Sequence, residues 1–243
     1  MKKAYFGFRE IPEEEKKDEV EAVFSRVAFR YDLMNDLMSA GLHRLWKRFT
    51  ISMAGFRQGD RVLDCAGGTG DMARLAAPKV LPKGEIVLAD INHAMLLQGK
   101  SILRNRGLMM PLVQCDGEHL PFKNRAFSHV ICAFGLRNMT HIDMALKEFA
   151  RVLRPGGKVL ILEFSKVWEP LSPLYDLYSF NVIPKLGELV AHDKESYRYL
   201  VESIRKHPDQ DTLAELMRQS GFDAVDVYRL TAGVVALHVG YVW

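Results

Sequence analysis

The sequence predicts an α/β protein built on a largely parallel sheet. Five short apolar runs, at about residues 61–64, 85–90, 112–115, 127–133 and 158–164, alternate with helix-like segments. Strands that alternate with helices imply a parallel sheet. Acids follow the first three runs, and ligands of such sheets gather at the carboxyl ends of the strands. A chain of 243 residues, nearly half of them apolar, is long enough for one large domain or one domain with an appended cap.

A glycine-rich loop follows the first predicted strand. The strand ends in Asp64, and the turn Ala66–Asp71 carries three glycines before a helix-like run begins at Met72. Glycines allow positive φ and let the backbone approach a ligand closely. Helix-opening amides then face that ligand. Three glycines with two acids exceed what a plain turn needs, so the loop predicts a cofactor site.

Two cofactors are compatible with this loop. Residues 68–73 match the dinucleotide pattern G-x-G-x-x-G/A, and Asp90 lies at about the expected distance downstream. However, Asp64 and Asp71 flank the loop, and they repel an anionic pyrophosphate while attracting a cationic sulfonium. The charge pattern therefore favours S-adenosylmethionine over a nicotinamide dinucleotide.

Composition narrows the class of protein. The net charge is +3 with dispersed lysines and arginines, which argues against a dedicated nucleic-acid surface but allows a weak basic patch facing anionic lipid. The three cysteines have no C-x-x-C spacing, which predicts buried thiols and no metal site or disulfide. The charged N-terminus is unlike a signal peptide, and no apolar run approaches the ~18 residues of a membrane span. We expect a cytoplasmic protein, at most peripheral at the inner face of the membrane.

The segment before the first strand predicts an N-terminal helical lid, residues 1–57, ahead of a cofactor-binding domain at 58–243. Residues up to 17 look loosely structured, and residues 20–30 have the apolar spacing of a helix. Residues 31–47 are rich in Met, Tyr, Trp, His and Asn. A packing helix and a lid over the cofactor both explain that composition.

Acids at strand ends suggest how a cofactor is held. Asp90 ends the second predicted strand, where a carboxylate can accept from two ribose hydroxyls. A helix is expected over residues 92–106. Asp116 follows the third strand and can accept from an adenine amino group, or it can act only as a turn or cap residue. Arg137 lies in the loop after the fourth strand, so Asp64, Asp90, Asp116 and Arg137 are expected at one edge of the sheet.

The second half of the chain predicts a cap and an antiparallel end. A helix over residues 142–153 is stopped by Arg-Pro-Gly-Gly at 154–157. Residues 165–206 form an apolar, aromatic insertion that predicts helices capping the sheet edge. Asp209 or Asp211 is expected to cap a helix that runs to about residue 219. Residues 224–230 and 234–242 alternate like a terminal pair of strands.

These residues together resemble a known family. The loop, Asp90 and residues 154–157 are similar to class I S-adenosylmethionine-dependent methyltransferases. More narrowly, the chain resembles the ubiquinone/menaquinone biosynthesis C-methyltransferases. The matching pieces are Tyr-Asp-x-Met-Asn at 31–35 with Ser39, His43 and Trp46, Asp-x-Ala-Gly-Gly-Thr-Gly-Asp at 64–71, Phe-Gly-Leu-Arg-Asn at 134–138, Arg-Val-Leu-Arg-Pro-Gly-Gly at 151–157 and His-Pro-Asp-Gln at 207–210.

The resemblance implies a Rossmann-like, seven-stranded, mostly parallel sheet whose last strand is antiparallel. It implies that S-adenosylmethionine is the cofactor and that a polyprenyl benzoquinol, a demethylmenaquinol or both are the acceptors. Ala133 stands where the family often has serine, which removes one side-chain contact to the cofactor. The expected cofactor-binding residues are Asp64, Gly68, Thr69, Gly70, Asp90, Asp116 and Gly117.

Methyl transfer to an aromatic carbon needs a neighbouring hydroxyl to lose its proton. Arg137 is the first candidate because a guanidinium can hold the phenolate through its fork of donors. Asp71 is the candidate proton acceptor, Tyr31 a relay, and Asn138 a group that positions the second ring oxygen. His119 and His43 are alternative bases, and a salt bridge that anchors the loop is the alternative role of Arg137.

Other functions remain open from the sequence. The protein could methylate a small soluble phenol or amine, or act as a cofactor-binding subunit that scaffolds a biosynthetic complex. An NAD oxidoreductase is disfavoured by the acids around the loop. The insertion at residues 174–190 predicts membrane contact or a channel for a lipid tail, and an ordinary packed cap explains its composition equally well.

Overall fold

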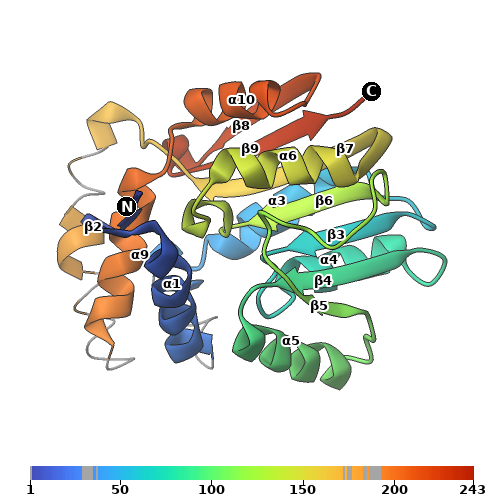
Figure 1. The fold of residues 1–243 in the computed structure, drawn as a ribbon, viewed down its shortest axis with the longest axis horizontal. Helices are drawn as coiled ribbons and strands as arrows, with labels where there is room; N and C mark the ends of the chain where they lie inside the picture. The colour runs from blue at the N-terminus through green and yellow to red at the C-terminus, as the bar shows by residue number, and fades with distance from the viewer. Residues whose placement is uncertain are drawn as a thin grey trace.

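The computed structural model describes residues 2–28, 35–36, 38–171, 173, 177–182, 185 and 193–243. A central sheet carries helices on both faces (Figure 1). The N-terminal hairpin and the helices α1 and α9 gather beside one end of this sheet (Figure 1). The chain therefore consists of a layered α/β body and a smaller helical group at its edge.

The sheet has seven strands in the order β5-β4-β3-β6-β7-β9-β8. All neighbours pair in parallel except β9, which is antiparallel to both β7 and β8. This topology confirms the expected mostly parallel sheet with an antiparallel last strand. Its strands are β3 (Arg61–Cys65), β4 (Glu85–Asp90), β5 (Leu112–Gln114), β6 (Phe127–Ala133), β7 (Leu153–Phe164), β8 (Ala224–Leu230) and β9 (Val235–Tyr241).

Two apolar layers hold the helices to the sheet, because alternate side chains of a strand point to opposite faces. Val62, Ile131 and Leu160 belong to the layer shared with α3 and α4. Leu63 and Val130 belong to the layer shared with α6 and α10. The helices are α3 (His43–Ala54), α4 (Asp71–Val80), α5 (His93–Asn105), α6 (Ile142–Val152) and α10 (Gln210–Gln219).

Two helix caps agree with the sequence analysis. The Asn92 side chain accepts from the Met95 amide and opens α5. Of the two aspartates proposed to cap the later helix, Asp209 is the cap, since its side chain accepts from the amides of Asp211 and Thr212. Side-chain oxygens at this position satisfy amides that have no partner within the helix.

The N-terminus differs from the expectation of a loosely structured segment. Strands β1 (Lys3–Phe6) and β2 (Arg9–Pro12) form a hairpin, and α1 (Glu13–Val27) begins at Glu13 instead of residue 20. Gly7 turns the hairpin at φ 59°, and Phe6 is buried with its ring stacked on Tyr199, 4.1 Å between centroids. The ordered N-terminal hairpin therefore depends on contact with Tyr199, which is distant in sequence. Local sequence patterns do not reveal such a contact.

The predicted end of the helix before residues 154–157 is confirmed, but the strand that follows starts earlier than residue 158. The helix ends at Val152, and β7 starts directly at Leu153, so the Pro-Gly-Gly turn lies within the strand. Gly156 has φ 76°, and the register against β6 shifts between Phe127 and His129. The turn is therefore an irregularity at the start of a long central strand.

The insertion is helical where the structure describes it. It contains a short turn at Glu169–Leu171, a π-helical turn at Tyr178–Val182 and the helix α9 (Lys194–Lys206). Tyr197 and Leu200 of α9 are fully buried. Most of residues 174–190 lie outside the described residues, as does Tyr31.

Candidate active site

A cleft lies beyond the carboxyl ends of β3, β4 and β6, and α1 covers it. Strand-end residues form one wall and side chains of α1 form the other. We call it the cofactor pocket, since it contains the glycine loop. Its lining residues include Lys17, Val20, Glu21, Phe24, Gly68, Asp90, Met95, Asp116, Gly117, Glu118, Phe134, Gly135 and Asn138.

Two glycines of this pocket pack closely against methionine side chains. A Cβ on Gly68 would lie 2.9 Å from Cε of Met95, and one on Gly117 would lie 2.8 Å from Cε of Met139. Gly68 also has φ 54°, a conformation that favours glycine. A side chain at either position would therefore displace a methionine that lines the pocket.

Asp90 lies where the sequence analysis placed a ribose acceptor. Its Oδ2 accepts from the Gly68 amide and its Oδ1 from the Asn92 amide, each at 2.8 Å. Burial raises the pKa of Asp90 to about 6, and the two amide bonds oppose that rise. A carboxylate has about four acceptor positions, so Asp90 retains capacity for two hydroxyl groups.

Asp116 lies at the far side of the pocket and pairs with Lys17 of α1. It also accepts from the Glu118 amide at 2.9 Å. Burial raises the pKa of Asp116, but the hydrogen bonds from Lys17 and Glu118 outweigh it and hold the pKa below its usual value. Asp116 is therefore an ionised acceptor, held in position by a residue of α1.

The described lining of the pocket does not include Asp64, Thr69 or Gly70, which instead stabilise the glycine loop. Asp64 is fully buried, and its Oδ2 accepts from the Ala73 amide at 2.8 Å. Burial raises the pKa of Asp64 to about 7. Gly70 takes φ 82° at the start of α4, and Thr69 is buried. These residues shape the turn that presents Gly68.

The charges around the pocket favour a cationic ligand. Glu21, Asp90, Asp116 and Glu118 line it, and Lys17 is the one Lys or Arg among its described lining residues. Lys17 is itself paired with Asp116. A pyrophosphate would face uncompensated carboxylates there, whereas a sulfonium and an amino group would be attracted. The side chains present therefore fit S-adenosylmethionine.

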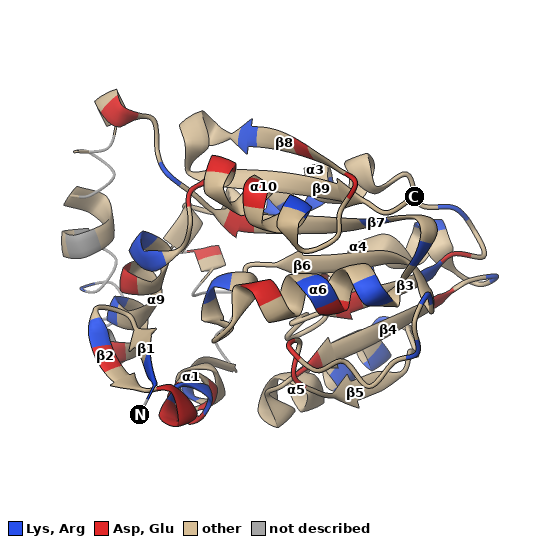
Figure 2. Cartoon of the chain, turned by 45° about the horizontal axis from the view of Figure 1, so that its top comes forward, with Lys and Arg blue, Asp and Glu red and all other residues tan. Residues whose placement is uncertain are grey.

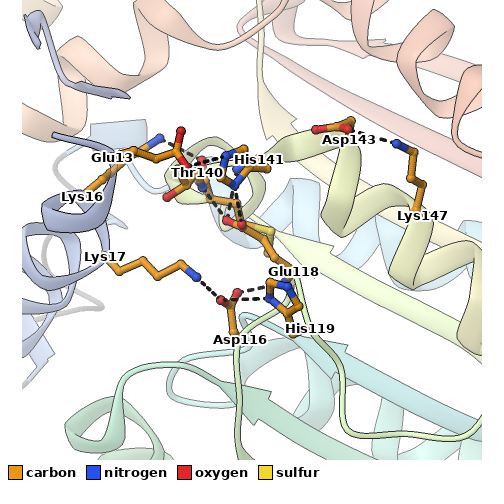
Figure 3. A network of polar contacts seen from close by, with 11 residues as sticks. Glu13, Lys16, Lys17, Asp116, Glu118, His119, Thr140, His141, Asp143 and Lys147 are labelled. Atoms are coloured by element: carbon orange, nitrogen blue, oxygen red, sulfur yellow. Dashed lines mark hydrogen bonds and ion pairs between the residues drawn. The ribbon is translucent and has the colours of Figure 1, made fainter. Parts of the chain in front are cut away.

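A polar network fastens α1 over the pocket (Figure 3). The Glu118 carboxylate accepts from the Thr140 amide at 2.6 Å and contacts Nδ1 of His141 at 2.9 Å. The other ring nitrogen of His141 lies 3.2 Å from Glu13. Lys16 donates to the carbonyl of Met139 at 2.8 Å. The first turns of α1 carry these charged groups (Figure 2), so the helix is attached to the strand-end loops by ionic contacts.

Arg137 is buried in an ion pair. Its Nη1 donates to Oε1 of Glu163 at 2.8 Å and to the carbonyl of Phe134 at 2.6 Å. Both side chains are almost fully buried, and the guanidinium lies over the Phe164 ring at 5.3 Å. The salt bridge that the sequence analysis named as the alternative role is present, and Nε of Arg137 has no hydrogen-bond partner in the described part of the chain.

Asn138 connects the pocket to α9. It lines the cofactor pocket, and its Oδ1 accepts from the Tyr199 hydroxyl at 3.0 Å. Burial raises the pKa of Tyr199, so its hydroxyl stays protonated. The Nδ2 of Asn138 donates to the Phe134 carbonyl at 3.4 Å, so the side chain is held from both sides.

Asp71 lies outside the described lining of the pocket. Lys47 donates to it at 2.8 Å and Arg74 at 3.1 Å. Burial raises its pKa, but these two cations outweigh burial and lower the pKa to about 2. A carboxylate with so low a pKa is a weak proton acceptor, so the geometry gives no support to a role for Asp71 as the base.

The alternative bases are placed differently. His43 is buried and lies 2.9 Å from Asp36, away from the pocket lining. His119 is exposed and lies 3.7 Å from Asp116. Neither imidazole lines the pocket, and each lies beside a carboxylate instead.

The sequence analysis predicted an N-terminal helical lid over residues 1–57 but did not identify the face of α1 that lines the pocket. Lys17, Val20, Glu21 and Phe24 repeat at helical spacing, but such a face predicts only that a helix packs against something. It does not say that the helix covers a cofactor. No group of three or more His, Cys, Asp or Glu with metal-binding geometry occurs among the described residues.

The sheet order, the antiparallel last strand and the acid-lined pocket at a glycine loop together define a class I S-adenosylmethionine-dependent methyltransferase. A solved structure of a SAM dependent methyltransferase from Aquifex aeolicus superposes with a TM-score of 0.58 at 15% identity, covering 80% of this chain and 87% of that one. At that identity the likeness shows the fold alone.

Sequence comparison then gives the family. The profile of the ubiE/COQ5 methyltransferase family matches residues 12–242. The "Ubiquinone/menaquinone biosynthesis C-methyltransferase UbiE" of Ralstonia pickettii (strain 12J) is 58% identical over 240 residues, 99% of each chain. The relative of the same name from Bordetella avium (strain 197N) is 60% identical over 97% of this chain and 92% of its own length. The chain belongs to the ubiE/COQ5 methyltransferase family.

Proposed function

We propose that the protein transfers a methyl group from S-adenosylmethionine to a ring carbon of a polyprenyl quinol precursor in ubiquinone biosynthesis, menaquinone biosynthesis or both. The observation that carries the proposal is the near-full-length similarity to relatives named for that reaction. The acid-lined pocket beside the Arg137–Asn138 loop agrees with it.

The cofactor would be held mainly by strand-end groups. Asp90 would accept from the ribose hydroxyls, and Asp116 from the adenine amino group. Gly68 and Gly117 line the pocket and would contact the ligand through their backbone. When bound, S-adenosylmethionine supplies a methyl group already activated on a sulfonium.

The acceptor would be held at the loop after β6. Arg137 would bind a ring oxygen, since a guanidinium donates in a fixed geometry. Glu163 orients that guanidinium through the 2.8 Å contact. Asn138 would position the second ring oxygen. We leave Asp71 out of this assignment because of its ion pairs, and a relay through Tyr31 stays a prediction.

The function is tested by purifying the protein and measuring methyl transfer to a hydroquinone that carries a short isoprenoid tail. We expect carbon methylation, and we expect a strain without the gene to accumulate the unmethylated quinone. Transfer to small phenols or amines but not to the tailed quinol would favour the alternative substrate class. Cofactor binding without any transfer would favour a scaffold subunit, and assembly with other enzymes of the pathway stays a prediction.

Contact with a membrane surface is the second part of the proposal. Trp168, Leu171 and Leu177 of the insertion are large apolar side chains, 62%, 41% and 57% exposed. A polyprenyl tail resides in a bilayer, and an exposed apolar group of this kind suits reversible contact there. No helix among the described residues is long and apolar enough to span a membrane.

Liposome flotation tests this contact. Trp168→Asp with Leu177→Asp should reduce binding to vesicles that contain anionic lipid. Leu97→Asp is the matched control, because Leu97 is 54% exposed on α5, which packs against β4 and β5 at the opposite edge of the sheet. Equal flotation of wild type and both variants would show that the insertion does not contact lipid.

A further inference from the structure

A second cavity of about 270 Å³ lies next to the cofactor pocket. It is bordered by the β1–β2 hairpin, α1, the loop after β6 and the end of α9. Met139 and Thr140 line both spaces. Asn138 lines the cofactor pocket, while its hydrogen-bond partner Tyr199 lines the second cavity. The two spaces are therefore adjacent.

Buried nitrogen atoms without partners occur on two residues that line this cavity. They are Nε of Arg137 and both ring nitrogens of His207, none of which has a hydrogen-bond partner among the described residues. Buried polar side-chain atoms in folded proteins are usually hydrogen-bonded to protein or to water. Three such atoms on two lining residues leave unused hydrogen-bonding capacity beside the cavity.

The backbone amide of His207 is hydrogen-bonded, whereas its ring nitrogens have no hydrogen-bond partner among the described residues. His207 follows α9, and its backbone amide donates to the carbonyl of Ser203 at 3.1 Å. Burial lowers the pKa of His207 to about 4, with Arg137 and His238 adding to the effect and Glu163 opposing it. The ring is neutral at neutral pH, and it offers one donor and one acceptor.

The remaining lining suits a ring. Tyr199 stacks on Phe6 and presents an aromatic surface to the cavity, and Ile142 and Met139 add apolar area. Arg137 brings no net charge to the inner end because Glu163 is paired with it. Lys3, Lys16 and Lys206 also line the cavity, and each of them already has a partner in Glu10, the Met139 carbonyl and the Tyr5 ring respectively.

We propose that this cavity binds the hydroxylated ring of the acceptor, with Arg137 Nε donating to a ring oxygen and neutral His207 accepting the hydrogen bond of that hydroxyl group. The inference rests on the proposed methyl transfer and adds His207 as an acceptor-binding residue. A neutral aromatic diol matches a site with two donors and one acceptor. A carboxylate or phosphate would leave the acceptor nitrogen of His207 unpaired.

The role of His207 is to orient the acceptor and not to take its proton. A phenol has a pKa near 10, as the tyrosine side chain does, so an imidazole with a pKa of about 4 is too weak to remove its proton. Orientation still affects the rate, because the attacking carbon must face the methyl group.

Direct binding tests the inference. The probe is a hydroquinone with a short isoprenoid tail, titrated into protein saturated with S-adenosylhomocysteine. His207→Phe keeps the ring volume and removes both polar atoms, so we expect the dissociation constant of the hydroquinone to rise roughly tenfold or more. His207→Gln retains a donor and an acceptor and should recover part of that loss. The affinity for S-adenosylhomocysteine should be unchanged in both variants.

The matched control is His238→Gln. His238 is also a buried histidine with a lowered pKa, but it bonds to the Gln210 carbonyl and does not line the cavity. Hydroquinone affinity should be unchanged in this variant. Wild-type affinity in both His207 variants would overturn the inference, as would tighter binding of a hydroxybenzoate than of the hydroquinone. If the wild type binds the hydroquinone but transfers no methyl group, the proposed function fails while the ring site stands.

Discussion

The cofactor pocket and the second cavity are neighbours, but they are built in different ways. The strand-end wall of the cofactor pocket comes from residues at or just after the ends of β3, β4, β5 and β6, and each of these strands contributes an acid or a glycine. The second cavity needs the β1–β2 hairpin, the loop after β6 and the end of α9, which are far apart in the sequence.

This difference indicates that the cofactor and the acceptor would be recognised by different parts of the fold. The proposed cofactor contacts depend on backbone groups and on acids whose positions follow from the sheet. The proposed acceptor contacts depend on buried side chains from separate segments, above all the Arg137–Glu163 ion pair and His207, whose pKa burial lowers. Substitutions should therefore separate the two binding events, and the following experiments test that separation.

The largest effect is expected at the buried ion pair. Arg137→Ala leaves the Glu163 carboxylate buried without its partner, which typically costs about 3–5 kcal/mol of unfolding free energy. Methyl transfer should fall at least about a hundredfold. Urea denaturation and initial-rate assays measure the two effects.

A paired variant separates anchoring from catalysis. Arg137→Met with Glu163→Met removes both charges, so much of the stability should return while turnover stays low. If turnover returns together with stability, Arg137 serves only as an anchor for the loop.

The next effect concerns the cofactor side. Asp90→Ala removes the proposed ribose acceptor and the acceptor for the Gly68 and Asn92 amides. Affinity for S-adenosylhomocysteine should fall by about 1–3 kcal/mol, which calorimetry measures. Hydroquinone affinity in protein saturated with S-adenosylhomocysteine should change little. Equal losses for both ligands would contradict the separation of the two sites.

A substitution at Asp71 tests whether the ion-paired carboxylate beside the glycine loop contributes to stability and not to turnover. Asp71→Asn removes the partner of the buried Lys47, so we expect lower stability at neutral pH and nearly normal turnover in the folded fraction. The folded pKa of about 2 lies below the ordinary value near 3.8, so this contribution is present above about pH 4 and is lost as the pH falls toward 2. Thermal melts of both proteins at pH 7 and pH 3 check the sign. A hundredfold loss of turnover with normal stability would restore Asp71 as the base.

The smallest effect is expected at the contacts that fasten α1. The hydrogen bond with Glu118, together with Glu13, raises the pKa of His141 above 6.5. The stability contributed by its charge is fully present below about pH 6.5 and is lost as the pH rises through the higher folded value. The stability difference between wild type and His141→Gln should therefore shrink between pH 6 and pH 9. Lys147→Gln is the control, since Lys147 is an exposed residue paired with Asp143 on α6.

The sequence determined the strand-end frame by itself. Apolar runs with the right spacing defined β4 and β6 with the observed bounds, and the glycine loop and the strand-end acids placed Gly68, Asp90 and Asp116 at one edge of the sheet, where all three line the pocket. These predictions succeeded because strand direction and side-chain alternation are local properties that a parallel sheet turns into proximity.

The tertiary structure decided the rest. The hairpin at the N-terminus, the cover provided by α1 and the pairing of Arg137 with Glu163 all join segments distant in sequence. Asp71 and His207 illustrate the reason most clearly. The residue types suggested a base for Asp71 and only a family motif for His207. In the structure the cations Lys47 and Arg74 lower the pKa of Asp71 against the effect of burial, whereas burial itself lowers the pKa of His207 beside a cavity. Protonation depends on what packs around a group, and that packing is a property of the folded chain.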